Sequence, residues 1–245
     1  MLNKLLRLRE VVCVDRRKLC SNRISLVILV WAWMFLGSIL TALSIAYVKG
    51  VPATFSEIID MFNGEPYLAS YVEVVAVGGL PLALTILCRD GFKVYVLTKA
   101  GLLKSVAASI PLAIAVLLPR VLYGGLNISS FNLRFPYNVW YALLGFSAYG
   151  PLEVFFTIWL IVNTDIIFHG LEKVFSPGLL ITVLIFGLSH VFLSPQAGIV
   201  NAIHVAAEWL ISGLIFKYTK NSIGLMIAWT LINGQVAYLV TGCLT

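Results

Sequence analysis

The sequence contains few charged residues and few cysteines. Of its 245 residues, 11% are charged and 60% are hydrophobic, whereas about 25% of the residues of a soluble domain are charged. This scarcity of charge excludes a soluble domain, a disordered chain and a nucleic-acid-binding domain, and it indicates an integral membrane protein. The four cysteines do not have zinc-ribbon or C-x-x-C spacing, and the composition also excludes a secreted disulfide scaffold.

Long uncharged runs predict the membrane-spanning helices. A helix needs about 20 apolar residues to cross roughly 30 Å of hydrocarbon. Runs of this kind lie at residues 24–48, 68–88, 102–122, 138–163, 178–193, 197–216 and 222–243. The sequence therefore predicts an all-α fold, a polytopic membrane bundle of about seven transmembrane helices.

The basic residues lie mostly on one side of these runs. With the N-terminus inside, the inner segments hold Lys4, Arg7, Arg9, Arg16, Arg17, Lys18, Arg23, Arg89, Lys93, Lys99, Lys104, Lys173, Lys217 and Lys220. The outer segments hold only Lys49, Arg120 and Arg134. Because cytoplasmic loops are enriched in Lys and Arg, we expect a cell-membrane protein with a cytoplasmic N-terminus and an external C-terminus. Cys13 and Cys20 would then face a reducing compartment, which argues against a stable disulfide.

Three parts of the chain follow from this reading. Residues 1–23 form a basic cytoplasmic arm, 24–137 form the N-terminal membrane helices, and 138–245 form a membrane core. The arm either only sets the topology or also contacts anionic lipid headgroups.

A small set of polar residues lies inside the predicted spans. Ionisable groups at bilayer depth are costly and usually face a bundle interior or a cavity. With a rise of 1.5 Å per residue, such groups in the last four spans lie roughly 14–20 Å from the inner ends. These residues are Glu153, His190, His204, Glu208 and the uncharged Asn233. They predict one polar layer near the midplane, in which His204 and Glu208 share a helix face. Another acid, Glu73, lies nearer the start of its span, and we place it apart from this layer.

Three segments of the C-terminal half resemble the motifs of a known family. In chain order they are Pro151-Leu-Glu-Val-Phe-Phe-Thr157, Phe186-Gly-Leu-Ser-His190 and Trp229-Thr-Leu-Ile-Asn233. They are similar to the motifs E-E-x-x-x-R, F-x-x-x-H and H-x-x-x-N/D of the CAAX prenyl protease and bacteriocin-processing (Abi) family of intramembrane proteases. The resemblance covers residues 138–243.

This resemblance implies a membrane-embedded endopeptidase without a cofactor. Glu153 would be the general base that activates water, and His190 and Asn233 would stabilise the developing oxyanion. The implied substrate is a peptide or a lipidated peptide, such as a prenylated CaaX peptide or a leader peptide. His204 and Glu208 would support the site, with His204 the candidate to replace a missing histidine.

The motifs are incomplete at three positions. Leu152 stands in place of the first glutamate, Thr157 in place of the arginine, and Trp229 in place of the histidine. If Glu153 is instead read as the first glutamate, Val154 and Ile158 replace the second glutamate and the arginine.

Other functions therefore stay open beside the protease. The chain is alternatively a catalytically inactive family member that serves as a membrane binding or scaffold protein, or a small proton- or ion-coupled transporter. A metal bound by Glu153, His190 and His204 is a weaker alternative, because a catalytic zinc site needs three protein ligands but no H-E-x-x-H spacing is present. The sequence carries no signal for an oligomeric state.

Overall fold

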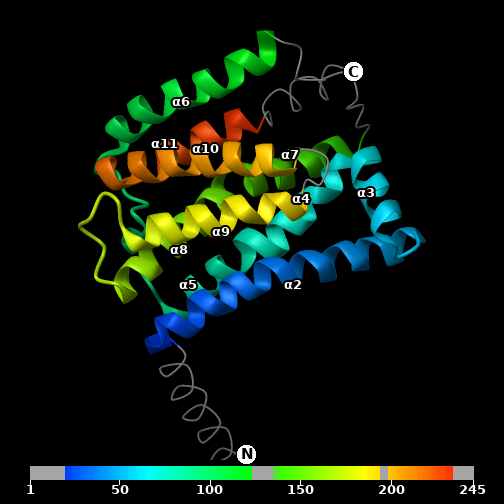
Figure 1. The fold of residues 1–245 in the computed structure, drawn as a ribbon, viewed down its shortest axis with the longest axis horizontal. Helices are drawn as coiled ribbons and strands as arrows, with labels where there is room; N and C mark the ends of the chain where they lie inside the picture. Colours follow the sequence, from blue (N-terminus) through cyan, green and yellow to red (C-terminus); the bar gives the residue numbers. More distant parts are fainter. Residues whose placement is uncertain (1–19, 123–134, 136, 194–197, 234–245) are drawn as a thin grey trace, which may run out of the picture.

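The computed structural model describes residues 20–122, 135, 137–193 and 198–233, and within them all the regular secondary structure is helical (Figure 1). The elements are α2 (Arg23–Lys49), α3 (Phe55–Gly64), the 3₁₀ turn η1 (Pro66–Leu68), α4 (Ala69–Val72), the π-helical η2 (Glu73–Gly79), α5 (Leu80–Cys88), the 3₁₀ turn η3 (Phe92–Tyr95), α6 (Leu102–Leu122), α7 (Tyr137–Ser147), the π-helical η5 (Ala148–Leu152), α8 (Glu153–Ile167), α9 (Pro177–Leu193), α10 (Gly198–Thr219) and α11 (Ile223–Ile232). The predicted basic arm lies mostly outside the described residues, as does the end of the last predicted span.

The described helices confirm the all-α fold and part of the predicted set of membrane spans. Five of them are long and apolar enough to cross a bilayer, namely Arg23–Lys49, Ala69–Cys88, Leu102–Pro119, Leu143–Ile167 and Gly198–Thr219. The other two predicted spans coincide with shorter apolar helices, at Pro177–Val191 and Ile223–Ile232. Large apolar side chains such as Ile28 and Leu36 of α2 are exposed, as expected for a surface that faces lipid rather than water.

Helix α8 lies at the centre of the bundle. Every residue from Glu153 to Asp165 is buried, because α2, η2, α5, α9 and α11 all pack against this helix. A helix that is apolar on all sides is expected in such a central position. The same hydrophobic core includes residues from α2 as well as α9, α10 and α11, so the predicted N-terminal helices and the predicted membrane core pack together.

The remaining helices pack closely where small residues allow it. Gly187 of α9 approaches Ala206 of α10, and Gly224 of α11 approaches the backbone of Ser105 in α6. Small residues let membrane helices come close enough for extensive van der Waals contact. Figure 1 shows α6 at the edge of the bundle, where it contacts α10 and α11.

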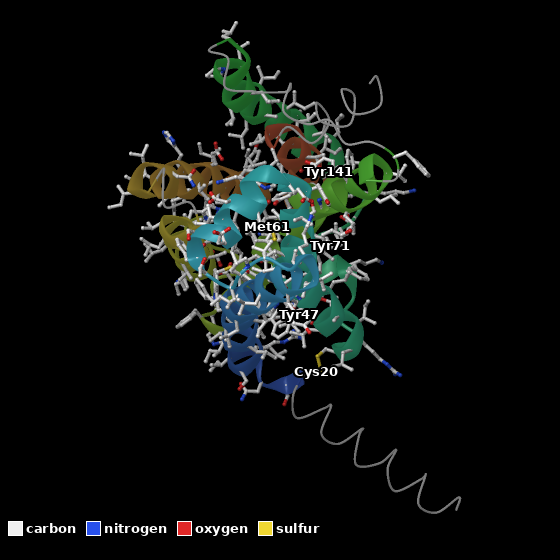
Figure 2. The ribbon with its side chains drawn as sticks, turned by 90° about the vertical axis from the view of Figure 1, so that its right-hand side faces the viewer. Cys20, Tyr47, Met61, Tyr71 and Tyr141 are labelled. Carbon is white, nitrogen blue, oxygen red and sulfur yellow. A yellow bond between two sulfur atoms is a disulfide. The ribbon has the colours of Figure 1, made fainter. Side chains whose placement is uncertain are left out.

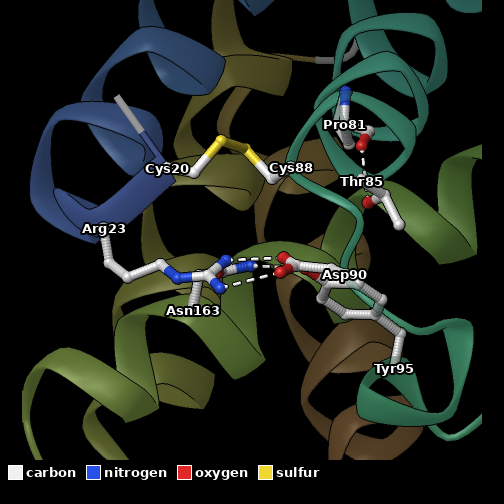
Figure 3. Close-up of a disulfide and its surroundings, with 8 residues drawn as sticks. All are labelled: Cys20, Arg23, Pro81, Thr85, Cys88, Asp90, Tyr95 and Asn163. Atoms are coloured by element: carbon white, nitrogen blue, oxygen red, sulfur yellow. Dashed lines mark hydrogen bonds and ion pairs between the residues drawn. A yellow bond between two sulfur atoms is a disulfide. The ribbon is translucent and has the colours of Figure 1, made fainter. Parts of the chain in front are cut away.

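A polar cluster, called the clasp below, links α2 and α8 to the segment after α5 at the end of the bundle where α2 begins (Figure 3). Arg23 donates to both carboxylate oxygens of Asp90, at 2.6 and 2.9 Å, and to Oδ1 of Asn163 on α8 at 2.9 Å. The Tyr95 hydroxyl donates to Asp90 at 2.8 Å. Burial would raise the pKa of Asp90, but the hydrogen bonds from Arg23 and Tyr95 and the Arg23 charge outweigh it and lower the pKa.

A disulfide beside this clasp corrects the expectation from redox compartment. Cys20 is bonded to Cys88, with 5.4 Å between their Cα atoms (Figure 3). The two residues are 68 positions apart, but the start of α2 and the end of α5 meet at this end of the bundle. Because stable disulfides form in oxidising compartments, this bond does not fit the expected cytoplasmic position of the end of the bundle where α2 begins.

A buried ion pair ties α8 to α10 at the same end. Lys217 of α10 donates to the Asp165 carboxylate, whose other oxygen accepts from the backbone N–H of Gly178 at 2.8 Å. The side chains of Lys217 and Asp165 are 4% and 0% exposed. Because a buried charge needs a partner and further hydrogen bonds, this pair fixes how the two helices end.

The opposite end carries a short helix across the bundle. Figure 2 views the molecule from this end, with Met61 of α3 labelled. Met61 is buried in a small cluster with Ala46 and Leu68, while the hydrogen-bonded pair of Lys49 and Glu65 joins the end of α2 to the residues after α3. The hydrogen bond from Lys49 is the main reason that the pKa of Glu65 is lowered.

Candidate functional site

Two π-helical segments meet in the middle of the bundle. The segment η2 lies in the second apolar helix and η5 in the fourth, and the two contact each other. At this contact the backbone of Gly78 approaches the Leu152 side chain so closely that a Cβ at Gly78 would clash. Single π-turns within α-helices occur frequently at functional sites. Pro151 accounts for the one in η5, because it lacks an N–H and cannot continue the α-helical hydrogen bonding.

Glu153 begins α8 directly after η5, and its side chain is inside the bundle. It is 6% exposed, and its Oε2 accepts a hydrogen bond of 2.6 Å from the indole Nε1 of Trp229 on α11. Trp229 is the residue that stands in place of the family's histidine. The indole has one N–H donor and no acceptor, so Trp229 can orient the Glu153 carboxylate but cannot exchange a proton with it.

Two further carboxylates lie near Glu153. Glu73, at the start of η2, and Glu208 of α10 are both close enough to interact with Glu153 electrostatically. The Glu73 oxygen Oε2 is buried and has no hydrogen-bond partner among the described residues. The structure thus corrects the expectation that Glu73 lies apart from the polar layer, because η2 packs beside η5 and brings it there.

His190 lies on α9, at the same depth along the bundle as Glu153. Phe156, three residues after Glu153, contacts Phe186, four residues before His190, with 5.7 Å between ring centroids. The short connection between α8 and α9 makes them antiparallel, so one turn from this contact leads to Glu153 on one helix and to His190 on the other. Nδ1 of His190 is 2.8 Å from the Phe186 carbonyl oxygen, so Nδ1 carries the proton. A neutral His190 therefore presents Nε2 as an acceptor.

Asn233 lies one turn after Trp229 on the same helix face. Its Nδ2 donates to the carbonyl oxygens of Tyr149 at 3.0 Å and Trp229 at 3.2 Å. The two bonds end α11 and fix it against η5, so that Trp229 faces Glu153. Because an amide NH₂ has two hydrogens, donation from Asn233 to an oxyanion would require one of these bonds to open.

The two residues of the predicted pair, His204 and Glu208, differ in burial. Both lie on α10, but His204 is exposed whereas Glu208 is partly buried and near Glu153. No contact is found between His204 and Glu153 in the described part of the chain. A role for His204 as the missing histidine therefore has no support from its position.

Aromatic rings enclose the site on the side of α9 and α10. Trp229 packs on Trp209 with 4.3 Å between ring centroids, and Trp209 packs edge-on against Phe186 at 5.6 Å. These rings are buried, so the carboxylate of Glu153 lies in a largely apolar surrounding in which its few polar contacts are stronger than in water.

Within the described ranges, no group of three or more His, Cys, Asp or Glu side chains is arranged to hold a metal ion. Comparisons of the chain with protein-family models, with curated proteins and with solved structures find no match.

Sequence reasoning missed two features of this site. Trp229 was recognised only as a departure from a motif, and its hydrogen bond to Glu153 has no signal in the sequence. Glu73 was recognised as an intramembrane acid, but its proximity to Glu153 depends on how the second and fourth apolar helices pack. The adjacent Gly78 and Gly79 were the available signal, since glycines in membrane helices mark close approach of a neighbouring helix.

Proposed function

We propose that this chain is a cell-membrane endopeptidase of the CAAX-processing type with seven spans. The observation that supports it best is the placement of Glu153, a carboxylate inside the bundle that is oriented by Trp229 and lies on the level of His190. The order of the motif residues along the chain and the helices that carry them add to this support. The substrate class is a peptide or a lipidated peptide that enters the membrane core.

In the proposed reaction, the Glu153 carboxylate takes a proton from water while the water oxygen bonds to the peptide carbonyl carbon. The tetrahedral intermediate then collapses, the C–N bond breaks, and Glu153 returns the proton to the leaving nitrogen. One water is consumed, and a new carboxyl and a new amine are released. Protonated His190 would donate through Nε2 to the oxyanion, since its Nδ1 is committed to the Phe186 carbonyl.

The proposal is tested with the full chain reconstituted in liposomes and a library of peptides with and without a prenyl group, using mass spectrometry to find new termini. We expect cleavage by the wild type and a loss of roughly 10²–10⁴-fold in Glu153→Gln, which is the usual contribution of a general base. Glu57→Gln, on the exposed side of α3, is the matched control and should cleave like the wild type. No cleavage of any library member would contradict the proposal.

A second candidate function is the binding or transfer of protons without peptide cleavage. The observation that favours it is that Trp229 and Asn233 use their donors within the protein, while Glu73 and Glu153 have no ion pair with Lys or Arg among the described residues. Proton flux into the same liposomes, lost in Glu153→Gln without any peptide cleavage in the wild type, would establish this function in place of the first.

A further inference from the structure

The partly buried residue Glu73 has no role in the proposed reaction. It is at the first position of η2, its Oε2 is buried, and no hydrogen bond to that atom is present in the described residues. A buried polar group without a partner is costly, and in a native structure it calls for a specific explanation.

Packing places Glu73 beside the residues that precede Glu153. The second and fourth apolar helices both run towards the end of the bundle that holds the Arg23 clasp. Asp90, which follows α5, and Asn163, near the end of α8, both accept hydrogen bonds from Arg23 there. The two helices are therefore parallel, and the contact of Gly78 with Leu152 sets their register. Five residues before Gly78, Glu73 lies near the level of Ser147, and it is close enough to Tyr149 and Glu153 to interact with both electrostatically.

The charged and titratable surroundings of this pair are few. Tyr149 interacts electrostatically with Glu73, Glu153 and Tyr141 of α7, while Glu208 approaches Glu153 from α10. His190 is the titratable residue of α9 nearest to this level. Two carboxylates in one apolar site disfavour each other's ionisation, and one proton held between them removes most of this repulsion.

We propose that Glu73 is a positioning residue for Glu153, and that the two carboxyls titrate as a coupled pair that holds one proton at neutral pH. Glu73 would thereby keep Glu153 basic enough to accept a proton from water. This role rests on Glu153 being the base of the proposed peptidase, whereas the coupling itself exists with or without activity.

The coupling is measured by infrared spectroscopy of the detergent-solubilised full chain, following the C=O band of protonated carboxyl groups against pH. Difference spectra with Glu153→Gln identify the Glu153 band. In Glu73→Gln we expect Glu153 to ionise at lower pH, with a change in proton affinity of at least about tenfold for charges several Å apart. By thermodynamic reciprocity, Glu153→Gln should change the affinity of Glu73 by the same factor. The thermal unfolding of each variant, and of Glu73→Asp as the conservative replacement, reports whether the fold is retained.

An unchanged Glu153 titration in a folded Glu73→Gln protein overturns the inference, as does an equal or larger effect of Glu208→Gln. Peptide cleavage separates the two proposals. A coupled titration in a protein that cleaves nothing retains the pair and refutes the peptidase. Cleavage with a pH profile that is identical in the wild type and Glu73→Gln retains the peptidase and refutes the pair.

Discussion

Replacing Lys217 by methionine removes the cation that compensates the buried carboxylate of Asp165. Both side chains are almost fully buried, and removing one partner of such a pair typically destabilises a protein by about 3–5 kcal/mol. Asp165 keeps the hydrogen bond from the Gly178 backbone, so its charge would not be left wholly unpartnered. We therefore expect a loss near the lower limit, about 3 kcal/mol.

The assay is reversible unfolding of the full chain in mixed micelles by increasing amounts of a denaturing detergent, followed by circular dichroism. Lys220→Met is the matched control, because Lys220 is exposed and donates to the Leu171 carbonyl between α8 and α9, to which Lys217 also donates. Its effect should stay within about 0.5 kcal/mol. In the double variant of Lys217→Met and Asp165→Asn both charges are gone. Its loss of stability should therefore be smaller than the sum of the two single losses by about 1 kcal/mol or more, because coupled sites differ from additivity by about 0.5–3 kcal/mol. Additive effects, or equal effects of the two lysine variants, would refute the assignment of a buried, coupled pair.

Three further predictions concern other contacts. The pKa of Asp90 is lowered in the folded protein. The clasp therefore stabilises the fold fully above the usual Asp pKa of about 3.9, and this contribution is lost as the pH falls through the lowered value. Unfolding at pH 7 and at pH 2 should show a loss of stability of about 1 kcal/mol that is absent in Asp90→Asn. Reduction of the Cys20–Cys88 bond, or Cys20→Ser, should lower the stability by about 4 kcal/mol for a loop of this length. Mass spectrometry should find Cys20 and Cys88 alkylated only when the chain is reduced before the alkylating reagent is added. Trp229→Phe removes the donor to the buried Glu153 carboxylate and should cost about 1–3 kcal/mol, while an unfolding midpoint equal to that of the wild type would contradict the hydrogen bond.

Features encoded along one helix were predictable from the sequence, and features that depend on packing between helices were not. Apolar runs gave the membrane class and the long helices, and a count along each run gave the common level of Glu153 and His190. The same count separated Glu73 from Glu153, because it took no account of the register between η2 and η5, which the contact of Gly78 with Leu152 decides. Lys217 follows directly after an apolar run and was placed in an inner segment, while Asp165 was not singled out. Their burial became visible only with the packing of α8 against α9 and α10. The Cys20–Cys88 bond is of the same kind, since it joins two helix ends that are distant in sequence.

Single-turnover cleavage of a reconstituted substrate measures whether Glu153 is the base of a membrane peptidase. We expect Glu153→Gln to lower the cleavage rate by at least about 10²-fold and Glu57→Gln to leave it unchanged. Equal cleavage rates in the wild type and Glu153→Gln would exclude Glu153 as the base.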